Sequence, residues 1–144
     1  MGQEKLGAVN EEVVKALGAF GGGIAATGGT CGIVIGGVAL ASSMYSRGNL
    51  EGKEDPKMWS LGSEFTRKFA EMAKPYGGMN CRDIAGVDWR DREAVKKYYA
   101  NPDSRRKICI NLVGEAAYLL GTLLETKAKA IRSSLYPDIA GSSA

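Results

Sequence analysis

Three cysteines are the residues best suited to chemistry in this 144-residue chain, because it contains no histidine. Without histidine the chain alone cannot supply a Ser-His-Asp triad, a Cys-His dyad, or a His-ligated zinc or haem. The cysteines are Cys31, Cys81 and Cys109, and no two of them form a CxxC pair. Zinc-ribbon, thioredoxin-like and ferredoxin spacings are therefore absent, so any shared chemistry requires the fold to bring the three thiols together.

The sequence around two of the cysteines favours a reactive thiolate. Cys31 follows two glycines and Thr30 at a predicted helix N-terminus, and Cys81 follows Asn80 at another. Free backbone N–H groups at such an end stabilise a thiolate, so the sequence predicts lowered thiol pKa values. The alternative for each is an inert thiol, and it is strongest for Cys109, because a cysteine on an apolar helix face usually acts as a small core residue.

Glycine is the compositional anomaly of the chain. Nine of its 20 glycines lie between Gly18 and Gly37, within a charge-free run over residues 16–46. The run is long enough to suggest a membrane-spanning helix, but its first half is too rich in glycine and threonine for a stable one. No basic segment precedes an apolar stretch at the N-terminus. We therefore expect a cytoplasmic protein that is not integral to a membrane, with reduced, metal-binding or catalytic cysteines.

Helix signals and breakers alternate along the rest of the chain. The typical helix starts are Asn10, Thr30, Asp55 with Pro56, Asn80 with Asp83, and Asp88 with Asp91. No segment reads convincingly as a strand. The sequence predicts a single all-α domain over residues 1–137, a compact bundle of about five helices with a glycine-rich loop between the first two, and a flexible tail over 138–144. The main helices are expected at residues 10–20, 31–45, 55–74, 88–99 and 101–135, the last with an apolar stripe at helical spacing, and a short helix is expected at 80–86.

The overall composition is that of an ordinary globular protein. Hydrophobic residues make up 44% and charged residues 24%, and the net charge is +3. This charge is too small to indicate nucleic-acid binding. The acidic residues near Asp83 and Asp88 alternate with arginines, which favours a solvated surface over a metal site.

Three segments together resemble the redox-active C_GCAxxG_C_C family. They are the Phe-Gly-Gly-Gly loop at residues 20–23, the Thr-Cys-Gly segment at 30–32, and the Asn-Cys-Arg segment at 80–82, with Cys109 early in the last helix. Their order, spacing and flanking residues fit from residue 10 to residue 124. The combination is specific to the family, whereas each segment alone is a weak signal.

The chain departs from the family pattern at two places. Ile33 stands where the family has alanine, and the family's first cysteine, on a helix upstream of the glycine loop, has no counterpart before Cys31. Either the chain is truncated or this member works with three thiols. If the chain is truncated, residues 1–7 are the remainder of a longer helix. The apolar surface on which the missing half would pack is then expected to be exposed or covered by a partner chain.

The resemblance implies a redox-active protein with clustered cysteine thiolates. Its leading interpretation is electron transfer by an iron–sulfur or other metal centre held by Cys31, Cys81 and Cys109, without c-type haem. A glycine loop could direct backbone N–H groups at the sulfurs, which makes cofactor-binding candidates of Gly21, Gly22, Gly23, Gly28, Gly29 and Gly32. The alternative is that these glycines bind no cofactor and only permit close helix packing.

Two other functions stay open at this point. The cysteines could act as a thiol–disulfide oxidoreductase or redox sensor, which requires two Cα atoms within about 7 Å. The chain could instead be a non-enzymatic helical interaction subunit. Whichever function holds, the partners expected for the chain are an unidentified redox protein and a second copy of itself. The sequence assigns no substrate.

Overall fold

The chain folds as an all-α protein, as predicted. The computed structural model describes residues 2–5, 7 and 9–135, the last nine of these by their backbone alone. Within these residues there is no strand, only an isolated antiparallel bridge between Thr30 and Asn80. The predicted tail lies outside them. The elements are α1 (Gly2–Lys5), α2 (Glu11–Ala16), η1 (Gly18–Phe20), α3 (Gly32–Tyr45), α4 (Lys57–Ala73), η2 (Lys74–Tyr76), α5 (Cys81–Ala85), α6 (Arg92–Ala100) and α7 (Arg106–Leu135).

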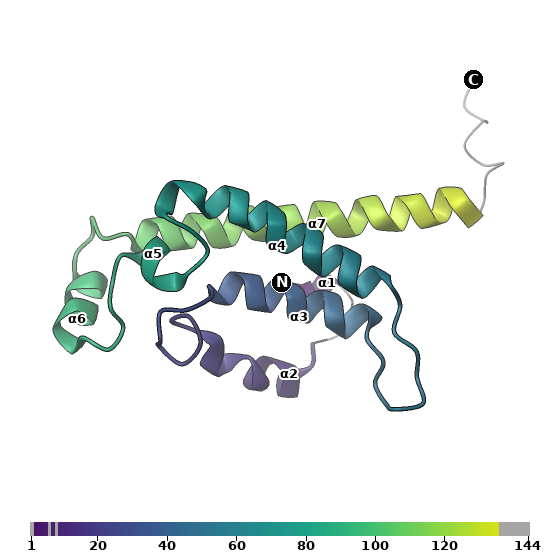
Figure 1. Ribbon diagram of the computed structural model, residues 1–144, viewed down its shortest axis with the longest axis horizontal. Helices are drawn as coiled ribbons and strands as arrows, with labels where there is room; N and C mark the ends of the chain where they lie inside the picture. Colours follow the sequence, from purple (N-terminus) through teal and green to yellow (C-terminus); the bar gives the residue numbers. More distant parts are fainter. Residues whose placement is uncertain (1, 6, 8, 136–144) are drawn as a thin grey trace, which may run out of the picture.

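The core lies between α3, α4 and α7. Helix α3 runs beside α4, and α7 passes behind α4 and also contacts α3 (Figure 1). Helix α4 repeats large apolar residues at helical spacing, so one face is buried while the other stays charged. The largest side chains that are fully buried are Phe65, Phe69, Leu61, Ile84 and Leu112. The same packing places Cys31 in the main core and Cys109 against its edge.

Side-chain caps explain where several helices begin. The carboxamide of Asn10 accepts the N–H groups of Glu12 and Val13, and the carboxylate of Asp91 accepts those of Glu93 and Ala94. The start at Asn10 is confirmed, whereas the helix predicted to open at Asp88 is capped three residues later by Asp91. The first helix is shorter than predicted, because α2 ends at Ala16 and continues only as a 3₁₀ turn into the glycine loop. Helix α7 begins at Arg106, a few residues after the predicted start.

Close packing between α3 and α4 depends on one glycine. The sequence points to Gly32 and Gly36 as the residues that admit a neighbouring helix. In the structure a Cβ atom on Gly36 would meet nothing, whereas one on Gly37 would overlap the ring of Phe65. The prediction of close approach was right for the helix and wrong for the residue, because α3 turns Gly37 toward α4.

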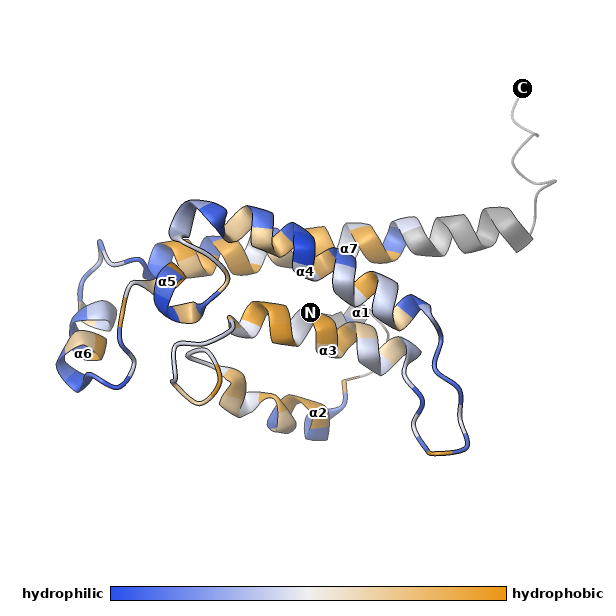
Figure 2. Ribbon diagram, in the orientation of Figure 1, coloured by the Kyte–Doolittle hydropathy of each residue, from blue (hydrophilic) through white to orange (hydrophobic). Residues whose placement is uncertain are grey.

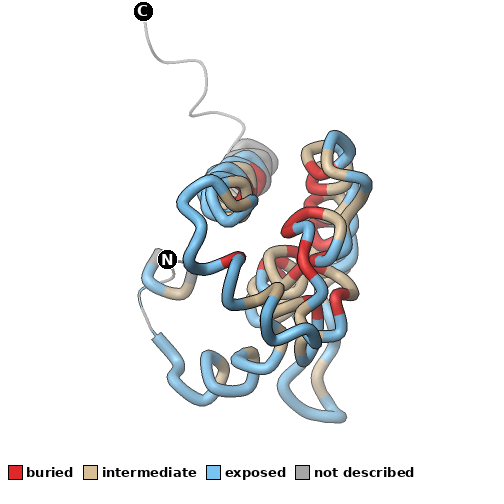
Figure 3. Tube along the Cα trace, turned by 90° about the vertical axis from the view of Figure 1, so that its left-hand side faces the viewer, coloured by how far each residue is buried: buried red, intermediate tan, exposed pale blue. Residues whose placement is uncertain are grey.

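Helix α2 stands away from this core. Its main contacts with another element are those with the adjacent η1. Figure 3 shows the segment around α2 as mostly exposed. An apolar groove of about 770 Å³ separates α1 and α2 from α3 and α7. Its walls include Val13 and Leu17 on one side, and Leu40, Ala117 and Leu124 on the other. The closest packing among the described helices is therefore that of α3, α4, α5 and α7, and the groove leaves apolar side chains uncovered between α2 and this core.

Helix α7 is apolar over much of its length (Figure 2). Its residues 106–126 are the one stretch, among the described residues, long and apolar enough to cross a membrane. Core helices of soluble proteins pass the same test, so this is weak evidence. Leu112, Ala116, Leu120 and Leu123 form the buried face of this helix, as the stripe in the sequence predicts. Val113, which belongs to the same predicted stripe, is 45% exposed.

Candidate redox site

A short antiparallel contact brings Cys31 and Cys81 to the same place. The N–H of Cys31 donates to the carbonyl of Met79 at 2.9 Å, and the N–H of Cys81 donates to the carbonyl of Gly29 at 2.7 Å. These bonds flank the Thr30–Asn80 bridge. Each cysteine then stands at the start of a helix, Cys31 before α3 and Cys81 as the first residue of α5. Two thiols far apart in sequence are thereby positioned by one backbone contact.

The glycine-rich loop before Cys31 is a left-handed turn. All five residues from Gly22 to Ala26 have positive φ, including Ile24, Ala25 and Ala26. Residues other than glycine are strained in this conformation. Glycine at positions 22 and 23 therefore lowers the conformational free energy of the turn. At Gly23 a Cβ atom would also overlap the backbone of Gly29. The turn is closed by the hydroxyl of Thr27, which donates to the carbonyl of Gly23.

This loop faces α5 with carbonyl groups, not with the N–H groups that the sequence interpretation expects. The carbonyl of Gly29 accepts the N–H of Cys81, and that of Gly28 accepts the N–H of Arg82 at 3.1 Å. The N–H groups of Gly28 and Gly29 are themselves bound within the loop. The reason is that the free donors at a helix start need acceptors. At these two glycines the loop therefore binds the start of α5 and leaves no free donor for a sulfur.

Cys109 joins the site from α7. It packs against both the main core and a smaller cluster formed by Ala85, Val87 and Tyr98. The hydroxyl of Tyr98, on α6, donates to the sulfur of Cys109 at 3.3 Å. All three cysteines are free thiols. A cysteine on the apolar stripe of α7 thus has a polar partner, which a purely structural core thiol does not need.

Burial governs the acidity of two thiols. It raises the pKa of Cys31, against a smaller lowering by the N–H of Ile33, and the charges of Cys81 and then Cys109 raise it further. Burial also raises the pKa of Cys81, where Trp89 opposes it and Cys109 adds to it. The predicted lowering is wrong, because desolvation outweighs the helix ends. Cys81 and Cys109 both act on Cys31, and Cys109 acts on Cys81, so the fold gathers the three thiols in one region of the molecule.

These raised pKa values predict a loss of stability in alkali. The folded chain holds thiol protons that the unfolded chain releases above the ordinary pKa of 9.0. Their contribution to the free energy of unfolding is therefore complete below about pH 8 and falls as the pH rises through the folded-state values. Urea unfolding from pH 7 to pH 10 measures this fall. The Cys31→Ala variant should show a shallower fall than the wild type, and equal slopes would contradict the assignment.

The donor set does not fit a single metal ion. Among the described residues, no three Cys, Asp or Glu side chains are arranged to hold one. The chain also has one thiol fewer than the four that an iron–sulfur cluster commonly takes. A cluster held by Cys31, Cys81 and Cys109 would therefore need a further ligand from elsewhere.

Two aromatic residues at the site were predicted only to pack a small helix onto the core. Trp89 lies beside Cys81, and Tyr98 contacts Cys109. Their rings meet edge to face with centroids 5.2 Å apart. Nothing in the local sequence distinguishes them from packing residues, because Trp89 is eight residues beyond Cys81 and Tyr98 belongs to a different helix from Cys109.

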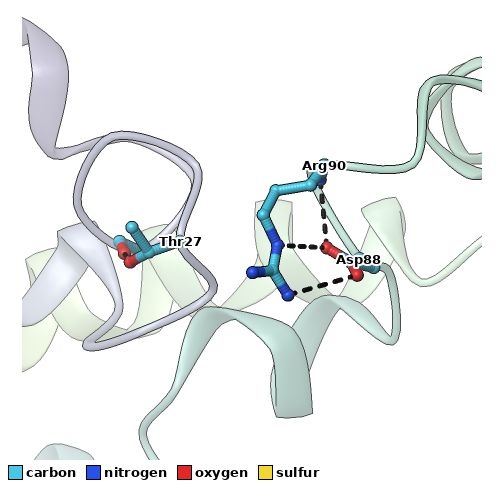
Figure 4. A network of polar contacts seen from close by, with 4 residues as sticks. Thr27, Asp88 and Arg90 are labelled. Atoms are coloured by element: carbon cyan, nitrogen blue, oxygen red, sulfur yellow. Dashed lines mark hydrogen bonds and ion pairs between the residues drawn. The ribbon is translucent and has the colours of Figure 1, made fainter.

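A polar pocket of about 370 Å³ opens next to this pair. Its walls join the glycine loop, through Thr27 and Gly28, to Arg82 and Trp89. Figure 4 shows Thr27 across from Arg90, whose guanidinium contacts the carboxylate of Asp88 at 3.2 Å. The solvated, salt-bridged surface predicted for this segment is confirmed for Asp88 and Arg90. The pocket leads from solvent to the residues that flank Cys81.

One family model matches the chain over residues 1–123, and its description is "Putative redox-active protein (C_GCAxxG_C_C)". Comparison with curated proteins and with solved structures gave no significant match. The match spans the glycine loop and all three cysteines, which are the segments that carry the resemblance in the sequence. The chain therefore belongs to the C_GCAxxG_C_C family of redox-active proteins.

Proposed function

We propose that the chain is a dithiol redox protein that transfers two electrons through a reversible Cys31–Cys81 disulfide. The observation that carries the proposal is the Thr30–Asn80 bridge, which ties the two cysteine-bearing segments together. Of the two other thiols, Cys81 has the larger electrostatic effect on Cys31. Both cysteines are buried, so exchange with a partner requires access through the polar pocket beside Cys81.

The oxidant in this proposal is a disulfide of a partner protein. The Cys81 thiolate attacks one partner sulfur, which forms a mixed disulfide and releases a partner thiolate. The Cys31 thiolate then attacks the Cys81 sulfur, forms the internal disulfide and releases the second partner thiolate. Two protons leave the cysteines and two are taken up by the partner. We assign the first attack to Cys81 because its neighbours Arg82 and Trp89 line the pocket that opens to solvent.

A thiol count tests this proposal. Mild oxidation should lower the number of free thiols from three to one, and a dithiol reductant should restore three. Peptide mapping should find the linkage between Cys31 and Cys81, and the Cys109→Ser variant should form it equally well. Three free thiols throughout the oxidation would overturn the proposal.

A second candidate is electron transfer by an iron–sulfur cluster on the three cysteines, as the sequence interpretation prefers. The third thiol favours it, because Cys109 has its own hydrogen-bond donor and a dithiol needs only two sulfurs. Such a cluster would supply one-electron chemistry when bound. Anaerobic purification followed by iron and sulfide analysis tests it, and iron-free protein that forms the disulfide would reject it.

The predicted partners are proposals of the same kind. We propose a redox partner whose surface is accessible to the pocket beside Cys81, and a homodimer whose mass can be measured by light scattering. Cytoplasmic location, the absence of nucleic-acid binding and the absence of a membrane anchor stay predictions. So does the division into a domain over residues 1–137 and a tail.

A further inference from the structure

One buried polar group at the site has no partner. Among the described residues that are not exposed, the indole Nε1 of Trp89 is the one buried side-chain nitrogen or oxygen without a hydrogen bond. Indole N–H can only donate, so no rearrangement of protons can satisfy it. Buried donors are nearly always paired, and an unpaired one calls for an explanation. An acceptor that becomes stronger when the site reacts would supply that explanation.

The acceptor that the geometry of the site offers is the sulfur of Cys81, because Trp89 lines the polar pocket together with Arg82, the residue that follows Cys81. In keeping with this placement, Trp89 opposes the rise that burial causes in the pKa of Cys81. A neutral thiol is a weak acceptor, whereas a thiolate accepts strongly. The contact is therefore poor while Cys81 is protonated, and becomes a charge-assisted hydrogen bond when the sulfur carries negative charge.

The indole is held in place from two sides. Tyr98 meets its ring edge to face, and the hydroxyl of Tyr98 in turn donates to the sulfur of Cys109. Within the segment that carries Trp89, the carboxylate of Asp88 accepts the backbone N–H of Arg90 at 3.0 Å and closes a turn around Trp89. A donor fixed in this way needs no rearrangement when charge develops beside it. The ring contact thus joins the unpaired donor of Trp89 to Tyr98, whose own donor is already bound to Cys109.

We propose that the Trp89 indole N–H stabilises the negative charge on the Cys81 sulfur as it attacks, or is released from, a disulfide. The inference rests on the proposed dithiol function. In the attack, the Cys81–partner S–S bond forms while the partner disulfide breaks and its electron pair leaves with the partner sulfur. In the reverse step Cys81 departs as the thiolate. The N–H donates in both directions and is not itself transferred.

The test compares Trp89→Phe with the wild type in reaction with a small aromatic disulfide at neutral pH. Peptide mapping gives a separate rate for each cysteine. Loss of the donor should slow Cys81 about tenfold, in keeping with the strength of a hydrogen bond to a charged group. The rate of Cys31 should be unchanged. A merely structural role would loosen the site and speed both thiols, so an unchanged or faster Cys81 overturns the proposal.

Matched variants keep the result interpretable. Trp59 is the other tryptophan and is 70% exposed, so Trp59→Phe should leave both rates unchanged. In the Trp59→Phe chain, benzothienylalanine can replace Trp89 and keep the two-ring shape without the N–H, which covers the case where phenylalanine disturbs folding. It too should slow Cys81 about tenfold, and wild-type speed rejects the inference. The first attack of Cys81 on the reagent, which releases one aromatic thiolate, requires no internal disulfide, so failure of the proposed function is detected separately by the thiol count.

Discussion

Replacing Cys81 with serine is expected to abolish the redox activity of the chain while leaving it folded. Serine has nearly the size of cysteine, and the N–H that Gly29 accepts belongs to the backbone. A hydroxyl does not exchange with disulfides, so no internal disulfide should form and the rate of partner reduction should fall by at least about a hundredfold. A coupled assay with a protein disulfide and mass spectrometry of the oxidised chain measure both effects.

Two further substitutions separate the roles of the thiols. Cys31→Ser should leave the first attack intact, so a mixed disulfide with the partner should accumulate at Cys81. Cys109→Ser should retain the internal disulfide and most of the rate, because Cys109 takes no part in the two exchange steps. An active Cys81→Ser chain, or mixed disulfides found at Cys109, would show that a different pair of thiols carries the chemistry.

Replacing Gly37 with alanine is expected to cause a large loss of stability. The added Cβ would overlap the ring of Phe65, which is 1% exposed and part of the main core. Overpacking of this kind forces side chains off their rotamers or helices apart and costs about 3 kcal/mol of the free energy of unfolding. Chemical denaturation followed by circular dichroism measures the change.

The neighbouring glycine supplies the control for this substitution. A Cβ on Gly36 would meet no atom, although the residue lies on the same helix. Gly36→Ala should therefore raise the free energy of unfolding by about 1 kcal/mol through helix propensity alone. If both variants lost similar stability, the close contact of α3 with α4 would be placed wrongly.

The helices could be predicted because their signals are local. The apolar repeat of α4 and the cap at Asn10 each depend on residues within one or two turns. Local competition also explains the failures at this level. Thr30, expected to cap α3, instead pairs with Asn80, and the side chain of Asn80 makes no cap bond. Both residues are used by a contact between segments that lie far apart in sequence.

The sequence indicated which thiols to consider, and their shared role stays a prediction, but it did not indicate the acidity that burial gives them. The family pattern in the sequence identified the three cysteines, and the fold brings them within electrostatic reach. The direction of the pKa shifts could not be predicted, because it depends on burial and on which carbonyl groups reach the start of α5. Trp89 could not be identified either, since its role follows from an indole orientation that depends on Tyr98.

The Thr30–Asn80 contact also sets an order for events on the ribosome. Everything that this contact needs, from the glycine loop to α5, precedes α7 in the chain. Synthesis runs from the N-terminus, so the segments of Cys31 and Cys81 emerge first, and Cys109 is delivered last by a helix that must dock onto an existing partner. A chaperone or an oxidant acting during translation therefore meets a two-thiol protein, and the three-thiol site exists only once α7 has left the ribosome.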